Sequence, residues 1–213
     1  MPKAKVLKVN PASPDKNAIA FAAELLKNGG LVAFPTETVY GIGANFSDKK
    51  AIERLYRIKK RPKNKPFTIH IASTGSIKKA GCTLSRFAKE LIKKFWPGPL
   101  TIITARKPGF RAVQEKGKLA FRMPRNEVAK ILIAEARVPV AAPSANISGK
   151  TPARKAAEVA KSLGNHVDLI LDGGRARIGR ESTIVDTTGS GYRIVREGAI
   201  PRSKIAHIWE ELE

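Results

Sequence analysis

A run of basic residues bounded by proline, KKRPKNKP at positions 59–66, is the first segment whose side chains could do distinctive chemistry. Its cationic residues are Lys59, Lys60, Arg61, Lys63 and Lys65. Lysine offers a point charge, and arginine offers a planar fork that matches phosphate oxygens. The prolines stiffen the run and end any preceding helix. A rigid loop that binds a triphosphate is one interpretation, and a solvated run of surface charge is the other.

A second segment, APSANISG at 142–149, follows the apolar run VPVA. Ser144 and Asn146 are two residues apart, so their side chains face the same way if the chain is extended there. A hydroxyl and an amide on one side can hold a phosphate, a ribose or a metal-bound water. The alternative is a turn or a helix cap, in which Ser-x-Asn is common.

A third segment, FPTETVYGIGANF at 34–46, supplies the hydroxyl groups of Thr36, Thr38 and Tyr40. Its glycines permit close approach of a ligand to the backbone. GIGANF is not a dinucleotide-binding fingerprint, because Phe46 stands where a third glycine is needed. The alternative is a tight turn whose hydroxyls cap the following helix.

Four further candidates lie in or at the ends of predicted strands. They are His70 in FTIHI, Arg122 in AFRMP, Ser182 in GRESTIVD and Arg196 in RIVREGAIPR. A buried arginine needs a carboxylate or phosphate partner, and the carboxylate of a bound amino acid would serve Arg122. Arg196 could reach a phosphate. A lone histidine among apolar neighbours is most often a core residue, which is the alternative for His70.

Several common chemistries have no signature in this chain. It contains no GxxxxGK[ST] loop for ATP, no clustered His and Cys metal motif and no GxSxG nucleophile elbow. Cys82 is the only cysteine. An internal disulfide and a cysteine-rich zinc site are therefore not expected, and a reducing cytoplasm fits.

The charge balance is strongly positive, because 40 Lys and Arg face 18 Asp and Glu for a net charge of +22. Such a chain attracts polyanions such as RNA, although a solvated lysine-rich surface is the alternative.

A chain of 213 residues that is 42% hydrophobic predicts one globular domain over residues 1–213. No apolar run approaches the roughly 18 residues of a membrane span, and no signal peptide is evident. We therefore expect no membrane contact and a cytoplasmic protein.

Hydrophobic periodicity predicts an α/β fold. The expected strands cover 4–9, 31–34, 67–71, 100–105, 119–123, 138–142, 169–171, 182–186 and 192–196. The expected helices cover 15–28, 49–59, 85–95, 127–136, 152–163 and 201–212. Some consecutive strands have no helix between them, which favours a mixed sheet flanked by helices over a purely parallel one.

The motifs taken together resemble the YrdC family of threonylcarbamoyl-AMP synthases. The resemblance runs from about residue 29 to residue 201 in one order: FPTETVYGIGA, Lys-x-Arg-Pro at 59–62, the strand with His70, WPGPLT, RMP, APSAN, ESTIVD and REGAIP. Each motif is weak by itself, and their common order is the strong signal. Because the sequence has 213 residues, we expect it to correspond to the short form of the family, without the second domain of longer members.

The resemblance implies an open, twisted α/β sheet with a basic concave groove. It implies synthesis of L-threonylcarbamoyl-AMP from L-threonine, bicarbonate or CO2 and ATP, with release of pyrophosphate and with Mg²⁺ assisting. The product would serve the threonylcarbamoyladenosine modification of tRNA beside the anticodon. Partners suggested in this way are tRNA or double-stranded RNA and a downstream threonylcarbamoyl-transferase complex.

The resemblance also implies the site residues. The catalytic set is Lys59, Arg61, Ser144 and Asn146. The ATP-binding set is Arg61, Lys65, Lys118, Ser144, Pro152 and Arg196, with Thr151 as the alternative to Pro152. The threonine-binding set is Thr38, His70, Arg122, Ala142 and Ser182, and no metal ligand is expected.

Roles for the catalytic set follow from their chemistry. Lys59 and Arg61 are expected to contact the triphosphate, while Ser144 and Asn146 orient the α-phosphate or the carbamate. One alternative is a non-catalytic RNA-binding or ribosome-associated protein that uses the same groove. Another is a relative of the same fold with a different acyl acceptor, against which the intact Ser-x-Asn element argues.

Overall fold

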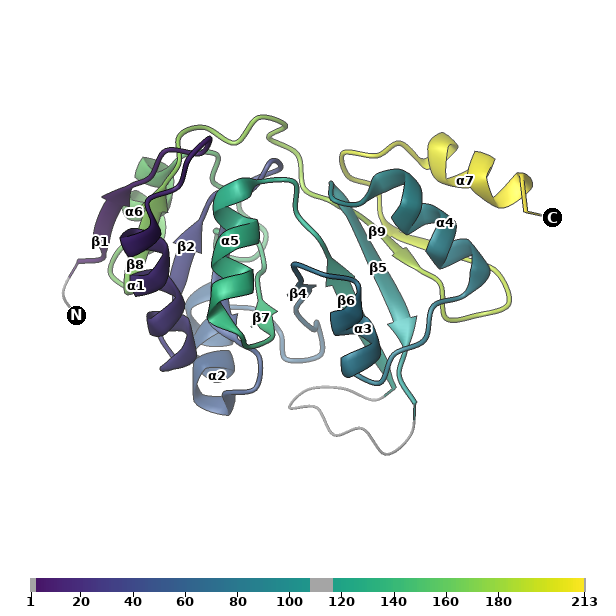
Figure 1. Ribbon diagram of the computed structural model, residues 1–213, viewed down its shortest axis with the longest axis horizontal. Coiled ribbons are helices and arrows are strands. Elements are labelled where there is room, and N and C mark those ends of the chain that lie inside the picture. Colours follow the sequence, from purple (N-terminus) through teal and green to yellow (C-terminus); the bar gives the residue numbers. More distant parts are fainter. Residues whose placement is uncertain (1–2, 108–116, 213) are drawn as a thin grey trace.

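One twisted sheet with helices on both of its faces forms the body of the protein, seen in the computed structural model (Figure 1), which describes residues 3–107 and 117–212. The strands are β1 (Lys5–Lys8), β2 (Val32–Phe34), β3 (Gly41–Asn45), β4 (Ile69–His70), β5 (Leu100–Ala105), β6 (Lys118–Arg122), β7 (Val140–Ala141), β8 (Leu169–Asp172), β9 (Thr183–Asp186) and β10 (Arg193–Arg196). The helices are α1 (Lys16–Lys27), α2 (Lys49–Lys59), α3 (Gly75–Lys79), α4 (Arg86–Phe95), α5 (Glu127–Ala136), α6 (Ala156–Leu163) and α7 (Arg202–Glu210).

The strand order within the described residues is β1-β8-β2-β3-β7-β4-β6-β5-β9-β10. The parallel pairs are β1 with β8, β2 with β8, β4 with β6 and β5 with β9. The remaining neighbours are antiparallel. The predicted mixed, open sheet flanked by helices is therefore confirmed.

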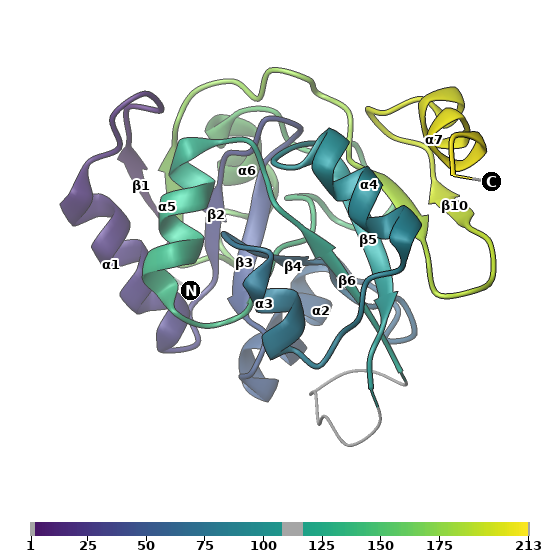
Figure 2. The same cartoon turned by 45° about the vertical axis from the view of Figure 1, so that its right-hand side comes forward.

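Two apolar cores lie against this sheet. On one face α1 and α5 lie side by side (Figure 1), and Ile19, Leu26 and Leu132 pack with Phe34 of β2. The second core takes in residues of α2, α4, α6 and α7. Figure 2 shows α4 lying over β5.

Polar residues at helix starts explain where the helices begin. The side chains of Asp15, Asp48, Ser85 and Asn126 each accept a hydrogen bond from a backbone N–H of the first turn. These groups satisfy N–H donors that have no partner within the helix. Helix α2 ends at Lys59, the next residue Lys60 has a left-handed φ of 48°, and the chain then enters the basic loop.

The sequence predictions differ from the structure in the segment 34–46, which contains a strand and a turn. Residues 41–45 form strand β3, which the sequence interpretation missed because glycine is unfavourable in strands. Gly43 is closely packed there, since an added Cβ would lie 3.0 Å from the Phe34 side chain and 3.1 Å from the Leu26 side chain. The hydroxyls of 34–46 do not cap the next helix, because Asp48 does so. The turn alternative holds only for residues 36–39, where Thr36 Oγ1 accepts from two backbone N–H groups.

Several other predicted elements were longer than the observed ones. The expected helix 152–163 begins only at Ala156, and the expected strands 67–71 and 138–142 pair over two residues each. Helix α3 was not expected at all.

Gly198 offers a test of how tightly the sheet edge is packed. An added Cβ at Gly198 would lie 2.2 Å from Glu181 O and 2.4 Å from Ser182 C, which are backbone atoms. We expect Gly198→Ala to lower the free energy of unfolding by about 2 kcal/mol through overpacking, measured by chemical denaturation. Gly191→Ala is the matched control, since nothing lies within 4 Å of its added Cβ. Equal stability of the two variants would contradict this packing.

Candidate functional site

Lys59 joins the two motifs that the sequence singled out. Its side chain leaves the end of α2 and is only 2% exposed. Nζ donates to Ser144 O at 2.5 Å, to Asn146 O at 2.7 Å and to Asn146 Oδ1 at 3.2 Å. Ser144 Oγ donates to the same Oδ1 at 2.7 Å. An ammonium group has three N–H donors, and these three acceptors match them in number, so Lys59 holds the residues around Ser144 and Asn146 in place.

Arg61 is held by the basic loop itself. Nε donates to Lys65 O at 2.7 Å and Nη2 donates to Pro66 O at 2.9 Å. The guanidinium also lies over the Phe67 ring, 5.3 Å from its centroid. Within the described part of the chain no hydrogen bond engages Nη1, so one end of this fixed cation is available to an anion. The Lys65 side chain is exposed, and its backbone carbonyl is the group that orients Arg61.

Arg122 is buried and has a carboxylate partner that the sequence interpretation missed. Nη2 donates at 2.8 Å both to Glu37 Oε1 and to Thr38 Oγ1, and Nε donates to Gly98 O at 3.3 Å. The other oxygen of Glu37 accepts from the backbone N–H of Arg125. The protein itself therefore supplies the counter-charge that was expected from a ligand. Nη1 of Arg122 makes no hydrogen bond to the described residues.

Ser182 and Arg196 lie together at the start of β9. Arg196 donates to Ser182 O from Nε at 3.1 Å and from Nη2 at 2.9 Å, and its Nη1 lies 2.8 Å from Glu181 Oε1. Ser182 Oγ lies 2.9 Å from Thr101 Oγ1. Glu181 and Thr101 were not predicted. The available signal for Glu181 was an acidic residue placed directly between Arg180 and the hydroxyl of Ser182 in GRESTIVD.

His70 and Arg122 are neighbours in the parallel pairing of β4 with β6. His70 is 3% exposed, and its Nδ1 has no hydrogen-bond partner in the described structure. Burial, reinforced by Arg122, holds the pKa of His70 well below its usual value. A neutral imidazole at this place can accept or donate one hydrogen bond without adding charge.

The remaining predicted residues are less central. Ala142 extends β7 and donates from its N–H to Thr68 O, while Pro152 lies before α6. Lys118 is 51% exposed at its side chain and lies 3.2 Å from Asp186. It is four residues from Arg122 along β6, or about 13 Å away, so it can meet only the far end of a ligand held at Arg122.

The site is electropositive. Burial lowers the pKa of Lys59 to about 8, with Arg61 acting in the same direction and Glu181 opposing it. Burial also lowers the pKa of Arg61 and of Arg196, and Glu181 again opposes the shift. Arginine remains charged in proteins, so several cations converge around one partly exposed carboxylate. Such an arrangement favours binding of a polyanion.

Metal ligands do not cluster in the described residues, where no group of three or more His, Cys, Asp or Glu could hold a metal ion. No described helix is long and apolar enough to cross a membrane.

Comparisons with known proteins place the chain among close relatives. A model of the Sua5/YciO/YrdC family, described as telomere recombination, matches residues 24–198. The threonylcarbamoyl-AMP synthase of Pyrococcus abyssi is 41% identical over 91% of this chain and 58% of its own length. The Bacillus subtilis protein of the same name is 41% identical over 88% of this chain and 55% of its own length. The chain thus spans less than two thirds of these relatives.

Similarity extends to solved structures. The crystal structure of P. abyssi Sua5 complexed with L-threonine superposes with a TM-score of 0.89 at 38% identity, covering 95% of this chain and 60% of that chain. Nearly all of this chain therefore has the fold of the matching part of P. abyssi Sua5.

The Lys59 network can be tested through stability. Lys59→Ala removes the donor for three buried acceptors, so we expect the free energy of unfolding to fall by about 3 kcal/mol. Lys63→Ala, in the exposed part of the same loop, should change it by less than about 0.5 kcal/mol. Urea denaturation of both variants measures the difference, and a Lys59→Ala protein as stable as Lys63→Ala would refute the network.

Proposed function

Because the chain belongs to the Sua5/YciO/YrdC family, we propose that it makes L-threonylcarbamoyl-AMP from L-threonine, bicarbonate or CO2 and ATP, releasing pyrophosphate. The observation that carries this proposal is the meeting of Lys59 with Ser144 and Asn146 beside Arg61 and Arg196. A hydroxyl, an amide and guanidinium groups held by the protein are donors that suit a nucleoside triphosphate. The relatives' names favour this enzyme over a non-catalytic RNA-binding protein.

The reaction needs positioning more than covalent catalysis. The amine of threonine adds to CO2 to give a carbamate and loses a proton. A carbamate oxygen then attacks the α-phosphorus of ATP, and the bond to the β,γ-diphosphate breaks. The electron pair and the negative charge leave with pyrophosphate, so fixed cations close to that bond stabilise the transition state.

Residue roles follow from which side-chain donors have no hydrogen-bond partner within the described residues. Nη1 of Arg122 would bind the threonine carboxylate, while Thr38, His70, Ala142 and Ser182 would contact the rest of the amino acid. Nη1 of Arg61 would contact the phosphates. Arg196 would reach them after exchanging its contact with Glu181. Lys59 would act as a positioning residue for Ser144 and Asn146, which orient the reacting phosphate.

Other assignments extend this proposal. Lys65, Lys118 and Pro152 would contact outer parts of ATP. Mg²⁺ would be bound mainly by the phosphates, in keeping with its preference for substrate oxygens and few carboxylates. We further propose one domain over residues 1–213 with a basic groove, contact with tRNA, transfer of the labile product to a threonylcarbamoyl-transferase complex, and a cytoplasmic location where ATP and tRNA occur.

Activity measurements test the assignment. The protein, incubated with ATP, Mg²⁺, bicarbonate and threonine, should give a product with the mass of the carbamoyl-adenylate, and none without threonine. Arg61→Ala and Ser144→Ala should each lower the rate about a hundredfold, near 3 kcal/mol of transition-state stabilisation. Arg57→Ala and Ser162→Ala, both exposed, are the controls. No product from the wild-type protein, together with stabilisation by RNA alone, would favour the RNA-binding alternative.

The pH dependence of the same activity tests the role of Lys59. Its pKa is lowered to about 8, so the ammonium is intact below pH 8 and loses a donor above it. Activity should therefore decline with a midpoint near pH 8. Glu181 favours the charged form, so Glu181→Gln should move the midpoint to lower pH, whereas Glu53→Gln on the surface of α2 should leave it in place. A midpoint that moves upward in Glu181→Gln would contradict this role.

A further inference from the structure

A cavity of about 970 Å³ adjoins the proposed site only at His70. Its apolar wall contains Phe46, Ile69, Leu119, Phe121 and Ile133, all of which are less than 7% exposed. Preformed cavities of a few hundred to about 1,000 Å³ with mostly apolar walls are the usual form of small-molecule sites. The size and the wall therefore suit a ligand with an apolar body.

Strand β6 separates this cavity from the proposed catalytic site. Leu119 and Phe121 line the cavity, whereas Lys118 and Arg122 belong to the proposed site. Because successive side chains of a strand point to opposite faces of the sheet, the two places lie on opposite faces of β6. Of the predicted substrate residues only His70 also lines the cavity.

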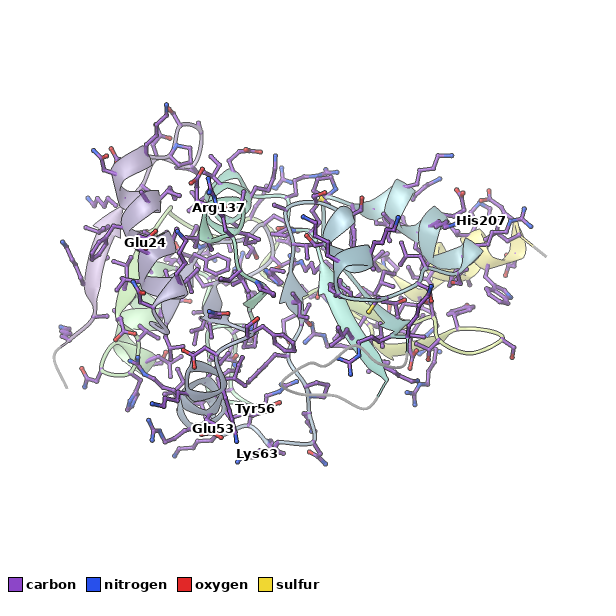
Figure 3. All side chains as sticks on the ribbon, turned by 60° about the horizontal axis from the view of Figure 1, so that its bottom comes forward. Glu24, Glu53, Tyr56, Lys63, Arg137 and His207 are labelled. Atoms are coloured by element: carbon purple, nitrogen blue, oxygen red, sulfur yellow. The ribbon has the colours of Figure 1, made fainter. Side chains whose placement is uncertain are left out.

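The cavity also lies far from the exposed end of the basic loop. Arg137 ends α5 and lines the cavity, while Lys63 belongs to the basic loop. Figure 3 shows these two side chains well apart, with Arg137 near α5 and Lys63 at the far end of α2. A ligand beside Arg137 would therefore not contact Lys63.

Besides the imidazole of His70, the polar groups of the cavity are mainly cationic or hydroxylic. They include Lys79 and Arg137, both exposed, and the hydroxyls of Ser47, Ser73 and Ser76. Among the described residues that line it, none is acidic. Arg137 has a left-handed backbone with a φ of 52° at the end of α5. Positive charge and hydroxyl donors without a carboxylate select an anionic group over a cationic one.

We propose that this cavity is a second ligand site, which binds a small organic anion with an apolar body. The apolar part lies against Phe121 and its neighbours, and the anionic group lies among Lys79, Arg137 and the serine hydroxyls. This assignment does not rest on the proposed synthase activity, because it uses none of the ATP-binding residues and shares only His70 with the threonine-binding set.

The test uses 8-anilinonaphthalene-1-sulfonate, an apolar anion whose fluorescence rises when it is bound. Lys79→Ala should weaken its affinity about fivefold by removing a partly exposed charge contact. Lys78→Ala is the matched control, since Lys78 is the preceding exposed residue of α3 and does not line the cavity. Equal weakening in both variants would mean general charge attraction and would overturn the proposal.

Two further variants examine the end of α5 and the cavity mouth. Arg137→Asn, chosen because asparagine tolerates a left-handed backbone, should also weaken binding. Ala134→Phe should reduce binding by filling space, whereas Ile131→Phe, an exposed position of α5 that does not line the cavity, should not.

Competition with the substrates separates this site from the catalytic one. Saturating ATP and threonine should leave the probe bound. Displacement of the probe by ATP, or unchanged affinity in Lys79→Ala, Arg137→Asn and Ala134→Phe, would place the probe elsewhere and overturn the proposal. If the wild-type protein binds the probe as expected but shows no synthase activity, the result counts against the proposed function and not against this site.

Discussion

The buried ammonium group of Lys59 is the constraint on which the candidate site depends. A buried charge is unfavourable unless hydrogen bonds compensate it, and the acceptors here are carbonyl and amide oxygens of Ser144 and Asn146. The end of α2 and the loop after β7 must therefore stay together. Arg61 follows two residues later, so the same contact fixes the basic loop relative to the serine hydroxyl.

The three arginines of the site are held in a common way. Arg61 is oriented by two carbonyls of its own loop, Arg122 by Glu37 and Thr38, and Arg196 by Ser182 and Glu181. Cations fixed before a substrate arrives need little reorganisation when charge develops in a transition state. This arrangement also explains why two carboxylates lie within an otherwise positive region.

Strand β6 shows how one short element can serve two surfaces. Its alternating side chains present Lys118 and Arg122 to one face and Leu119 and Phe121 to the other. The short β4 pairs beside it, which brings His70 next to Arg122 and Ile69 next to Phe121. The register of a two-residue strand thus decides which residues meet at the site.

The sequence by itself determined every described helix except α3, most strands, the mixed sheet, the positive charge and the motifs that mark the family. These features depend on periodicity, turn residues and local order, which are read from neighbours in the chain. Only the tertiary structure decided that Lys59 binds residues 85 and 87 positions away, that Glu37 neutralises Arg122 and that 41–45 is a strand. The physical reason is that burial and long-range pairing determine which donors are already used, and no local pattern records how many remain for a ligand.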